Sequence, residues 1–178
     1  IGRGRDIMED KALGEYLLND PKSRAEHAFV VRVLKDAFSQ ACHEVDIPDA
    51  PVLMKLKDIQ HLYTPVSGRL KTGESILKLV SRLHPTPAVG GFPREAAVAL
   101  IRDHEQLDRG WYAAPVGWMD EQGSGEFAVA LRSGLLRERE GWLFAGCGIV
   151  ADSDPESEFE ESCWKLRPML NALEEVGQ

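Results

Sequence analysis

The sequence has few cysteines, no long apolar run and none of the short motifs that mark the commoner enzyme classes. Its three cysteines, Cys42, Cys147 and Cys163, are widely spaced and odd in number, which excludes a disulfide framework and a zinc site of paired cysteines. No H-E-x-x-H spacing, phosphate-binding loop, dinucleotide fingerprint or G-x-S-x-G elbow is present. No apolar segment approaches the roughly 20 residues that span a bilayer. We therefore expect a cytoplasmic protein with free, buried thiols and no membrane segment.

The composition is that of a soluble globular protein with an acidic balance. Of the 178 residues, 43% are apolar and 28% charged, and the net charge is −8. That charge argues against general affinity for nucleic acid, because the phosphate backbone would repel it. It leaves room for a small acidic substrate in a local basic pocket. The chain begins with Ile1 rather than Met and has no signal-peptide pattern, so we expect Ile1 to be a boundary inside a longer protein.

Two helices are expected in the first part of the chain. Leucines at helical spacing predict a helix over residues 9–18, and Pro21 ends it because proline disfavours helical geometry in the preceding residue. An apolar stripe with three- and four-residue spacing predicts a second helix over residues 23–45. Ser23, followed three residues later by Glu26, fits a capping box at its start.

The middle of the chain alternates short extended and helical segments. Strands are expected over residues 52–56 and 59–70, and helices over residues 75–83 and 94–104. Residues 84–93 separate the two helices. We expect them to form a rigid loop, because prolines fix φ and paired glycines permit close backbone approach.

The last part of the chain is predicted to be mostly sheet. Strands are expected over residues 111–119, 126–136 and 142–150, the second because apolar and polar residues alternate in it. A final helix is expected over residues 156–173. The order predicts an α+β fold, with helices packed on a largely antiparallel sheet.

Acidic residues cluster at the start of that final helix. Glu158 and Glu161 are three residues apart and project from one face. The spacing alone favours a solvated acidic face, which complements the positive end of the helix dipole. The alternative is a site for a hard cation such as Mg²⁺, which prefers oxygen ligands.

Four other residues are candidates for binding an anionic ligand. Gly146 and Gly148 indicate either a strand bulge or a backbone whose N–H groups bind a carboxylate. Arg132 stands in an otherwise apolar segment and needs an anionic partner, which is either a structural salt bridge or a ligand. Lys165 is either an ion-pair partner of Glu161 or a positive charge for a substrate.

Several segments, in order along the chain, resemble those of the chorismate-utilising enzymes, which include isochorismate, salicylate, anthranilate and aminodeoxychorismate synthases. The segments are residues 20–27 (DPKSRAEH), 60–62 (QHL), 83–91 (LHPTPAVGG), 108–113 (DRGWYA), 115–118 (PVGW), 130–133 (ALRS), 145–150 (AGCGIV) and 158–161 (EFEE) with Lys165. Residues 60–64 and 115–118 are most similar to isochorismate synthases of the menaquinone type. The resemblance implies that residues 1–178 are the C-terminal part of a single chorismate-binding domain, without its N-terminal part.

The resemblance also implies roles for individual residues. Glu26 and Glu161 are then magnesium ligands, and Glu158 holds a metal-bound water or supports the ligands. The ion would clamp the ring carboxylate of chorismate. The carboxylates of chorismate would also be held by Arg132, by Lys165 and by the N–H groups around Gly146 and Gly148, with His61 near the reacting ring.

In the family reaction a nucleophile adds to C2 of chorismate and the C4 hydroxyl leaves. In an isochorismate synthase the nucleophile is water, a lysine is its base, and a glutamate protonates the leaving hydroxyl. The resemblance puts both residues before Ile1, so we expect this chain to supply binding groups rather than the acid and base.

The alternative functions are anthranilate, aminodeoxychorismate or salicylate synthesis, or a non-catalytic binding module. We expect the whole protein to be a monomer, and the chain alone to expose apolar sheet surface and self-associate.

Overall fold

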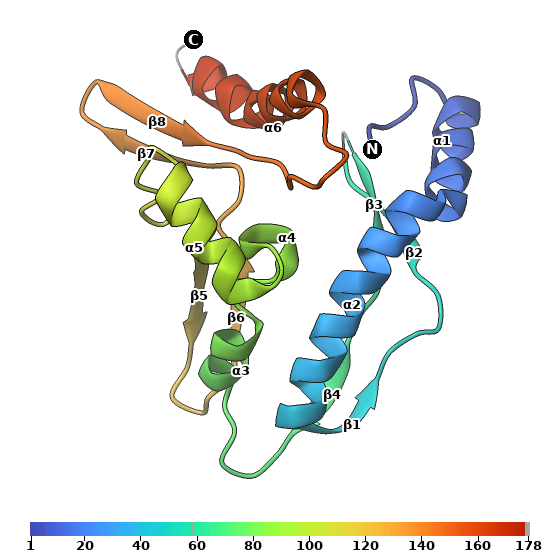
Figure 1. Cartoon of the computed structure of the whole chain (residues 1–178), viewed down its shortest axis with the longest axis vertical. Coiled ribbons are helices and arrows are strands. Elements are labelled where there is room, and N and C mark those ends of the chain that lie inside the picture. The colour runs from blue at the N-terminus through green and yellow to red at the C-terminus, as the bar shows by residue number, and fades with distance from the viewer. Residues whose placement is uncertain (58, 177–178) are drawn as a thin grey trace. The chain divides into compact units, whose positions relative to one another are not determined.

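The computed structural model describes residues 1–57 and 59–176, which fall into two units, Ile1–Leu83 and His84–Gln178. Both units combine helices with two-stranded antiparallel ladders (Figure 1). The α+β class and the antiparallel pairing are therefore as the sequence predicts. The strands form four separate pairs within the described ranges, β1–β4, β2–β3, β5–β6 and β7–β8, rather than one continuous sheet.

In residues 1–57 and 59–83, the first unit has three helices and four strands. They are α1 (Ile7–Asn19), α2 (Pro21–Ala41), β1 (Cys42–Asp46), β2 (Val52–Lys55), β3 (Gln60–Tyr63), β4 (Ser67–Leu70) and α3 (Ile76–Leu83). Helix α2 lies along β1 and β4, and α1 contacts the β2–β3 hairpin. The buried apolar residues of this unit are Leu17, Ala41 and Cys42.

The start and end of α2 differ from the prediction. Asp20, not Ser23, is the N-cap: its carboxylate accepts a hydrogen bond from the Ser23 N–H at 2.8 Å. Pro21 then takes the first helical position, where its missing N–H costs nothing. The helix ends at Ala41 rather than near residue 45, because residues 42–46 pair as β1 with β4. In residues 42–46, pairing with a distant strand outweighs the helical spacing of apolar residues that predicted a longer helix.

A cluster around Asp10 holds α1 to the β2–β3 hairpin and to the first residues of the chain. The Asp10 carboxylate is 2.5 Å from Arg3 Nε and 2.7 Å from Lys55 Nζ, and it also accepts from the Gly4 N–H. Hydrogen bonds from Arg3 first, and then from Lys55, lower the pKa of this carboxyl far below its ordinary value. Asp10 is buried, so these partners offset the loss of its hydration.

In residues 84–176, the second unit has three helices and four strands. They are α4 (Pro87–Gly90), α5 (Arg94–His104), β5 (Pro115–Met119), β6 (Gly125–Val129), β7 (Ser133–Arg137), β8 (Glu140–Phe144) and α6 (Pro155–Val176). Helix α6 contacts β8, and α4 contacts α5. The predicted helix 94–104 has the observed bounds, with Pro93 as its N-cap. The loop predicted over residues 84–93 contains the short helix α4.

Two strand predictions in this unit were too long, in addition to the strand predicted over residues 142–150, which ends at Phe144. The strand predicted over 111–119 begins only at Pro115, because residues 110–113 form turns in which Ala113 has a φ of 65°. The strand predicted over 126–136 is two strands, β6 and β7, separated by residues 130–132. Backbone hydrogen bonds join Ala130 to residues 113 and 114, so the chain turns after β6 instead of running on.

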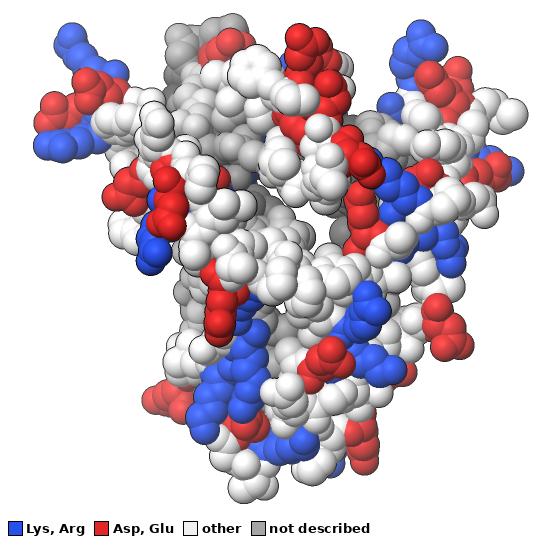
Figure 2. Space-filling view, in the orientation of Figure 1, with Lys and Arg blue, Asp and Glu red and all other residues white. Residues whose placement is uncertain are grey.

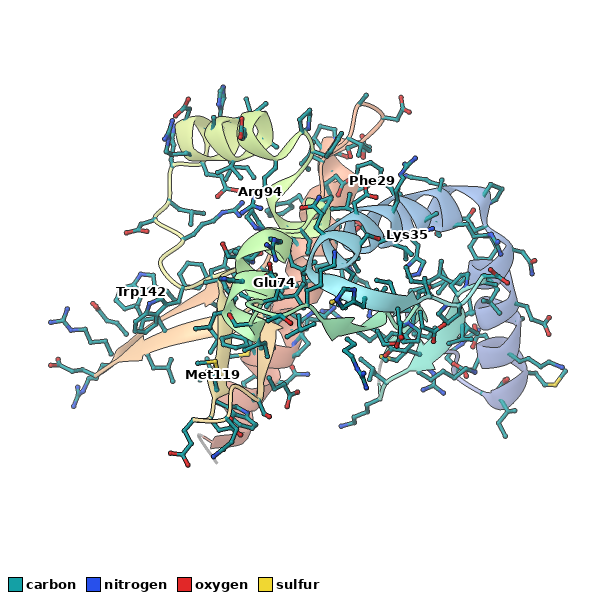
Figure 3. All side chains as sticks on the ribbon, turned by 90° about the horizontal axis from the view of Figure 1, so that it is seen from below. Phe29, Lys35, Glu74, Arg94, Met119 and Trp142 are labelled. Carbon is teal, nitrogen blue, oxygen red and sulfur yellow. The ribbon has the colours of Figure 1, made fainter. Side chains whose placement is uncertain are left out.

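The hairpins of the second unit leave large apolar side chains exposed. Leu136 is 64% exposed, Trp118 59% and Trp142 45%. Trp142 and Met119 project from their hairpins in Figure 3. A two-stranded hairpin buries little apolar surface by itself, so these faces need further cover for stability.

Acidic and basic side chains are interspersed over the face seen in Figure 2. None of the helices in the described ranges is long and apolar enough to cross a membrane.

Candidate functional site

The glycine-containing segment 145–150 is an irregular loop. The strand predicted over residues 142–150 stops at Phe144, and the chain then reaches α6 without strand pairing. Within residues 1–57 and 59–176, neither the Gly146 nor the Gly148 N–H donates a backbone hydrogen bond. The prediction of a bulged strand over this segment is therefore wrong. Unpaired N–H groups in a loop are what the carboxylate-binding alternative requires.

Helix α6 begins at Pro155, one residue before the predicted start at residue 156. The Asp154 carboxylate accepts from the Ser157 N–H at 2.9 Å, and Pro155 is the first helical residue. Glu156 and Glu158 lie in the first turn, where carboxylates interact favourably with the helix dipole.

Two contacts join this helix to the glycine loop, residues 145–150, and one of them comes from a lysine that also forms an ion pair within the helix. Lys165 Nζ lies 2.5 Å from Glu161 Oε1 and donates to the Gly146 carbonyl at 3.1 Å. The Cys147 thiol donates to the Glu158 carbonyl oxygen at 3.2 Å. Burial first, then a side-chain hydrogen bond with Glu158 and the negative charges of Glu158 and Glu161, raise the pKa of Cys147. The structure therefore brings together four of the predicted site residues, Gly146, Glu158, Glu161 and Lys165. Gly148 follows Cys147 in the same loop.

Tyr112 is a polar residue of this region that the sequence reasoning did not single out. Its ring stacks on Phe144 with centroids 5.6 Å apart, and the Arg109 guanidinium lies 5.7 Å from the ring centroid. A Cβ added at Gly146 would be 3.1 Å from the Tyr112 hydroxyl oxygen, so that hydroxyl borders the glycine loop. Burial raises the pKa of Tyr112, which keeps the phenol protonated as a donor. The sequence signal that could have identified Tyr112 is its place in the segment 108–113, one of the segments that resemble chorismate-utilising enzymes.

The sequence analysis predicted Arg132 within a strand. The structure instead places it in the turn between β6 and β7. Its φ of 49° is in the left-handed region, and its side chain is half-buried. Within the described ranges it has no ion pair with a carboxylate, so the structural salt bridge considered for it does not form.

Glu26 and His61 both lie in the first unit. Glu26 is exposed in the second turn of α2, and His61 is on the exposed side of β3, opposite Met54 of β2. Next to Glu26, the His27 ring is 2.8 Å from the Thr64 hydroxyl, just beyond β3. This hydrogen bond ties the turn of α2 that carries Glu26 to the end of the strand that carries His61. Burial lowers the pKa of His27.

The chemistry of the acidic residues suits Mg²⁺, because carboxylate oxygens are its usual protein ligands. No group of three or more His, Cys, Asp or Glu side chains converges to hold a metal within residues 1–57 and 59–176. Mg²⁺ needs fewer, since it commonly keeps waters and takes one or two protein carboxylates together with the anionic groups of a substrate. The donor set is therefore compatible with this ion.

A cavity of about 410 Å³ lies in the second unit, beside α5. It is mainly apolar, with polar groups from residues including His84, Arg102, Glu105 and Arg109. Arg109 pairs with Glu105, which offsets its charge. Tyr112 forms part of the wall, but none of the eight binding residues predicted from the sequence lines this cavity.

Comparison with known proteins gives a family match over nearly the whole chain. The family model described as chorismate binding enzyme matches residues 1–174. Isochorismate synthase MenF of Bacillus subtilis is 54% identical over 173 residues, which are 97% of this chain and 37% of that protein. The salicylate biosynthesis isochorismate synthase of Pseudomonas aeruginosa is 52% identical over 177 residues, 99% of this chain and 37% of that protein.

Solved structures agree with this match. The 2,3-dihydroxybenzoate-specific isochorismate synthase DhbC of Bacillus anthracis is similar with a TM-score of 0.89 and 38% identity, over 97% of this chain and 46% of that one. Anthranilate synthase component I of Streptococcus pneumoniae is similar with a TM-score of 0.85 and 27% identity, over 94% of this chain and 41% of that one. The chain thus spans less than half the length of each of these four proteins.

Proposed function

Because this chain belongs to the chorismate binding enzyme family, we propose that it is the metal- and carboxylate-binding part of an isochorismate synthase. The observation that carries the proposal is the identity of 54% and 52% to two isochorismate synthases over almost the whole chain. The reaction is the addition of water at C2 of chorismate with loss of the C4 hydroxyl as water. No net oxidation or reduction occurs.

The glycine loop and Lys165 are proposed to bind a carboxylate of the substrate. Support comes from the unpaired N–H groups of Gly146 and Gly148 and from the position of Lys165, which contacts the Gly146 carbonyl. A carboxylate at this loop gains fixed donors and a positive charge together. Arg132 is proposed as a second cationic contact, supported by its lack of a carboxylate partner within the described ranges, and His61 as a residue near the ring.

Glu26 and Glu161 are proposed as Mg²⁺ ligands, with Glu158 as a supporting carboxylate. When bound, Mg²⁺ would neutralise a substrate carboxylate and fix its orientation. The side chains of this chain bind and orient. The lysine base and glutamate acid implied by the family resemblance are proposed to lie elsewhere in the whole protein.

The direct test is to incubate the whole protein that carries this chain with chorismate and Mg²⁺ and to identify the product. We expect isochorismate, with no requirement for ammonia and no pyruvate. Anthranilate with pyruvate, formed from ammonia, would overturn the isochorismate assignment in favour of the activity named for the Streptococcus relative. Salicylate with pyruvate would indicate a salicylate synthase.

A further inference from the structure

We propose that Ser153 is a positioning residue, whose single hydroxyl group fixes both the end of the glycine loop and the Glu158 carboxylate. This inference rests on the proposed function and deepens it. Ser153 Oγ donates to Glu158 Oε1 at 2.6 Å and accepts from the Val150 N–H at 3.0 Å. A serine hydroxyl has one proton and two lone pairs, so both contacts can form at once with the proton directed to the carboxylate.

Ser153 is itself held by the backbone. Its N–H donates to the Val150 carbonyl at 3.0 Å, while the Val150 N–H donates to the Ser153 hydroxyl. These reciprocal bonds close the turn by which the chain passes from the glycine loop to α6. The hydroxyl therefore has little freedom to follow a moving Glu158 side chain, and the carboxylate is held in place instead.

The hydroxyl is not needed to cap the helix. Asp154 provides that cap, since its carboxylate accepts from the Ser157 N–H. If Ser153 served only to begin α6, its hydroxyl proton would have no required acceptor. The Ser153 proton is instead directed to the Glu158 carboxylate, one turn into the helix. The main-chain carbonyl of Glu158 accepts a hydrogen bond from the Cys147 thiol of the glycine loop.

The consequence is that the two sides of the proposed site are linked through one atom. Groups that hold a metal-side carboxylate commonly change metal affinity 10- to 100-fold when removed. Here the same group also orients the loop proposed to bind a substrate carboxylate. Loss of the hydroxyl should therefore weaken Mg²⁺ and chorismate together, rather than one of them.

The test uses Ser153→Ala, Ser153→Thr and Ser162→Ala in the whole protein. Ser162 is the matched control, because its hydroxyl donates locally, to the Phe159 carbonyl of the same helix, and to no other group among the described residues. We expect Ser153→Ala to raise the Mg²⁺ concentration for half-maximal activity about tenfold, and to raise KM for chorismate. Ser153→Thr, which keeps a hydroxyl, should restore most of both, and Ser162→Ala should change neither. Wild-type values in Ser153→Ala would overturn the proposal.

Two further measurements keep the result interpretable. Hydrogen exchange of the Val150 N–H, measured without metal or substrate, should be about fivefold faster in Ser153→Ala, because this N–H loses its acceptor and with it one ordinary hydrogen bond; unchanged exchange would contradict the proposal. If Ser153→Ala does not fold, Ser153→Cys takes its place with the same expectations.

A double-mutant cycle with Glu158→Gln separates this inference from the proposed function. Ser153→Ala should add little to the Mg²⁺ effect of Glu158→Gln, because that variant already lacks the charged carboxylate that Ser153 positions; fully additive effects would overturn the role given to Ser153. A normal Mg²⁺ response in Glu158→Gln would overturn the role proposed for Glu158 itself. A shifted response in Glu158→Gln with none in Ser153→Ala would overturn only the Ser153 proposal.

Discussion

Lys165 and Glu161 form an ion pair across one turn of α6, with 2.5 Å between Nζ and Oε1, and the same ammonium group contacts the Gly146 carbonyl. As a purely structural pair at this spacing it would contribute only about 0.3–0.5 kcal/mol. As a group that binds a substrate carboxylate it would matter far more, since hydrogen bonds to charged groups contribute about 1.5–3 kcal/mol. The two roles can therefore be separated by measurement.

We predict that Lys165→Gln raises KM for chorismate about 10- to 100-fold while lowering the free energy of unfolding by less than about 0.5 kcal/mol. Lys11→Gln is the matched control, because Lys11 pairs with Glu15 at the same spacing on α1. Steady-state kinetics and denaturant unfolding of both variants decide. A loss of stability in Lys165→Gln without a change in KM would assign the residue to structure alone.

Tyr112 should contribute through its hydroxyl. Tyr112→Phe keeps the stacking on Phe144 but removes the donor beside Gly146. We predict a fall in kcat/KM of about fivefold, the equivalent of one ordinary hydrogen bond of about 1 kcal/mol, with little change in thermal stability. Unaltered kcat/KM would make Tyr112 a packing residue of the second unit.

The Asp10 cluster predicts acid sensitivity of the first unit. The pKa of Asp10 is depressed in the folded protein, chiefly by its hydrogen bond from Arg3. Its contribution to stability is therefore fully present above the unfolded carboxyl value of 3.8 and is lost as pH falls below it. Asp10→Asn should destabilise the protein at pH 7 and flatten the decline of stability below about pH 4. Equal pH dependence of urea unfolding in the wild type and the variant would contradict this.

The three cysteines should react at different rates. Cys163 is exposed, Cys147 is half-buried and Cys42 is buried. The raised pKa of Cys147 also lowers its thiolate fraction at any given pH, and the thiolate is the reactive form. Mass spectrometry after brief alkylation near pH 8 should find Cys163 modified first and Cys42 last. Faster modification of Cys147 than of Cys163 would mean that the contact to Glu158 does not persist in solution.

The sequence predicted elements best where local signals decide them. The breaks at Pro21 and Pro93 and the start of α6 after Asp154 are set by proline geometry and by a capping carboxylate, which can be read from neighbouring residues. The strand ends were predicted poorly. Residues 42–46 and 130–132 depend on which distant strand or turn pairs with them, and periodicity does not contain that information.

The site shows the same division. Glu161 and Lys165 are four residues apart on one helix, and their ion pair was one of the two alternatives predicted, because helical spacing fixes which side chains share a face. Ser153 and Tyr112 were missed because their importance comes from one hydroxyl meeting a particular partner. For Tyr112 that partner, the glycine loop, lies more than 30 residues further along the chain.

Our central proposal is that the Glu26 and Glu161 carboxylates of this chain bind Mg²⁺ in the whole protein. The most direct test compares Glu26→Gln and Glu161→Gln with Glu160→Gln, a neighbouring exposed residue of α6, in the whole protein. Calorimetric titration with Mg²⁺ in the presence of chorismate should show binding weakened at least tenfold in the first two variants and unchanged in the third. Wild-type Mg²⁺ affinity in Glu26→Gln and Glu161→Gln would contradict the account.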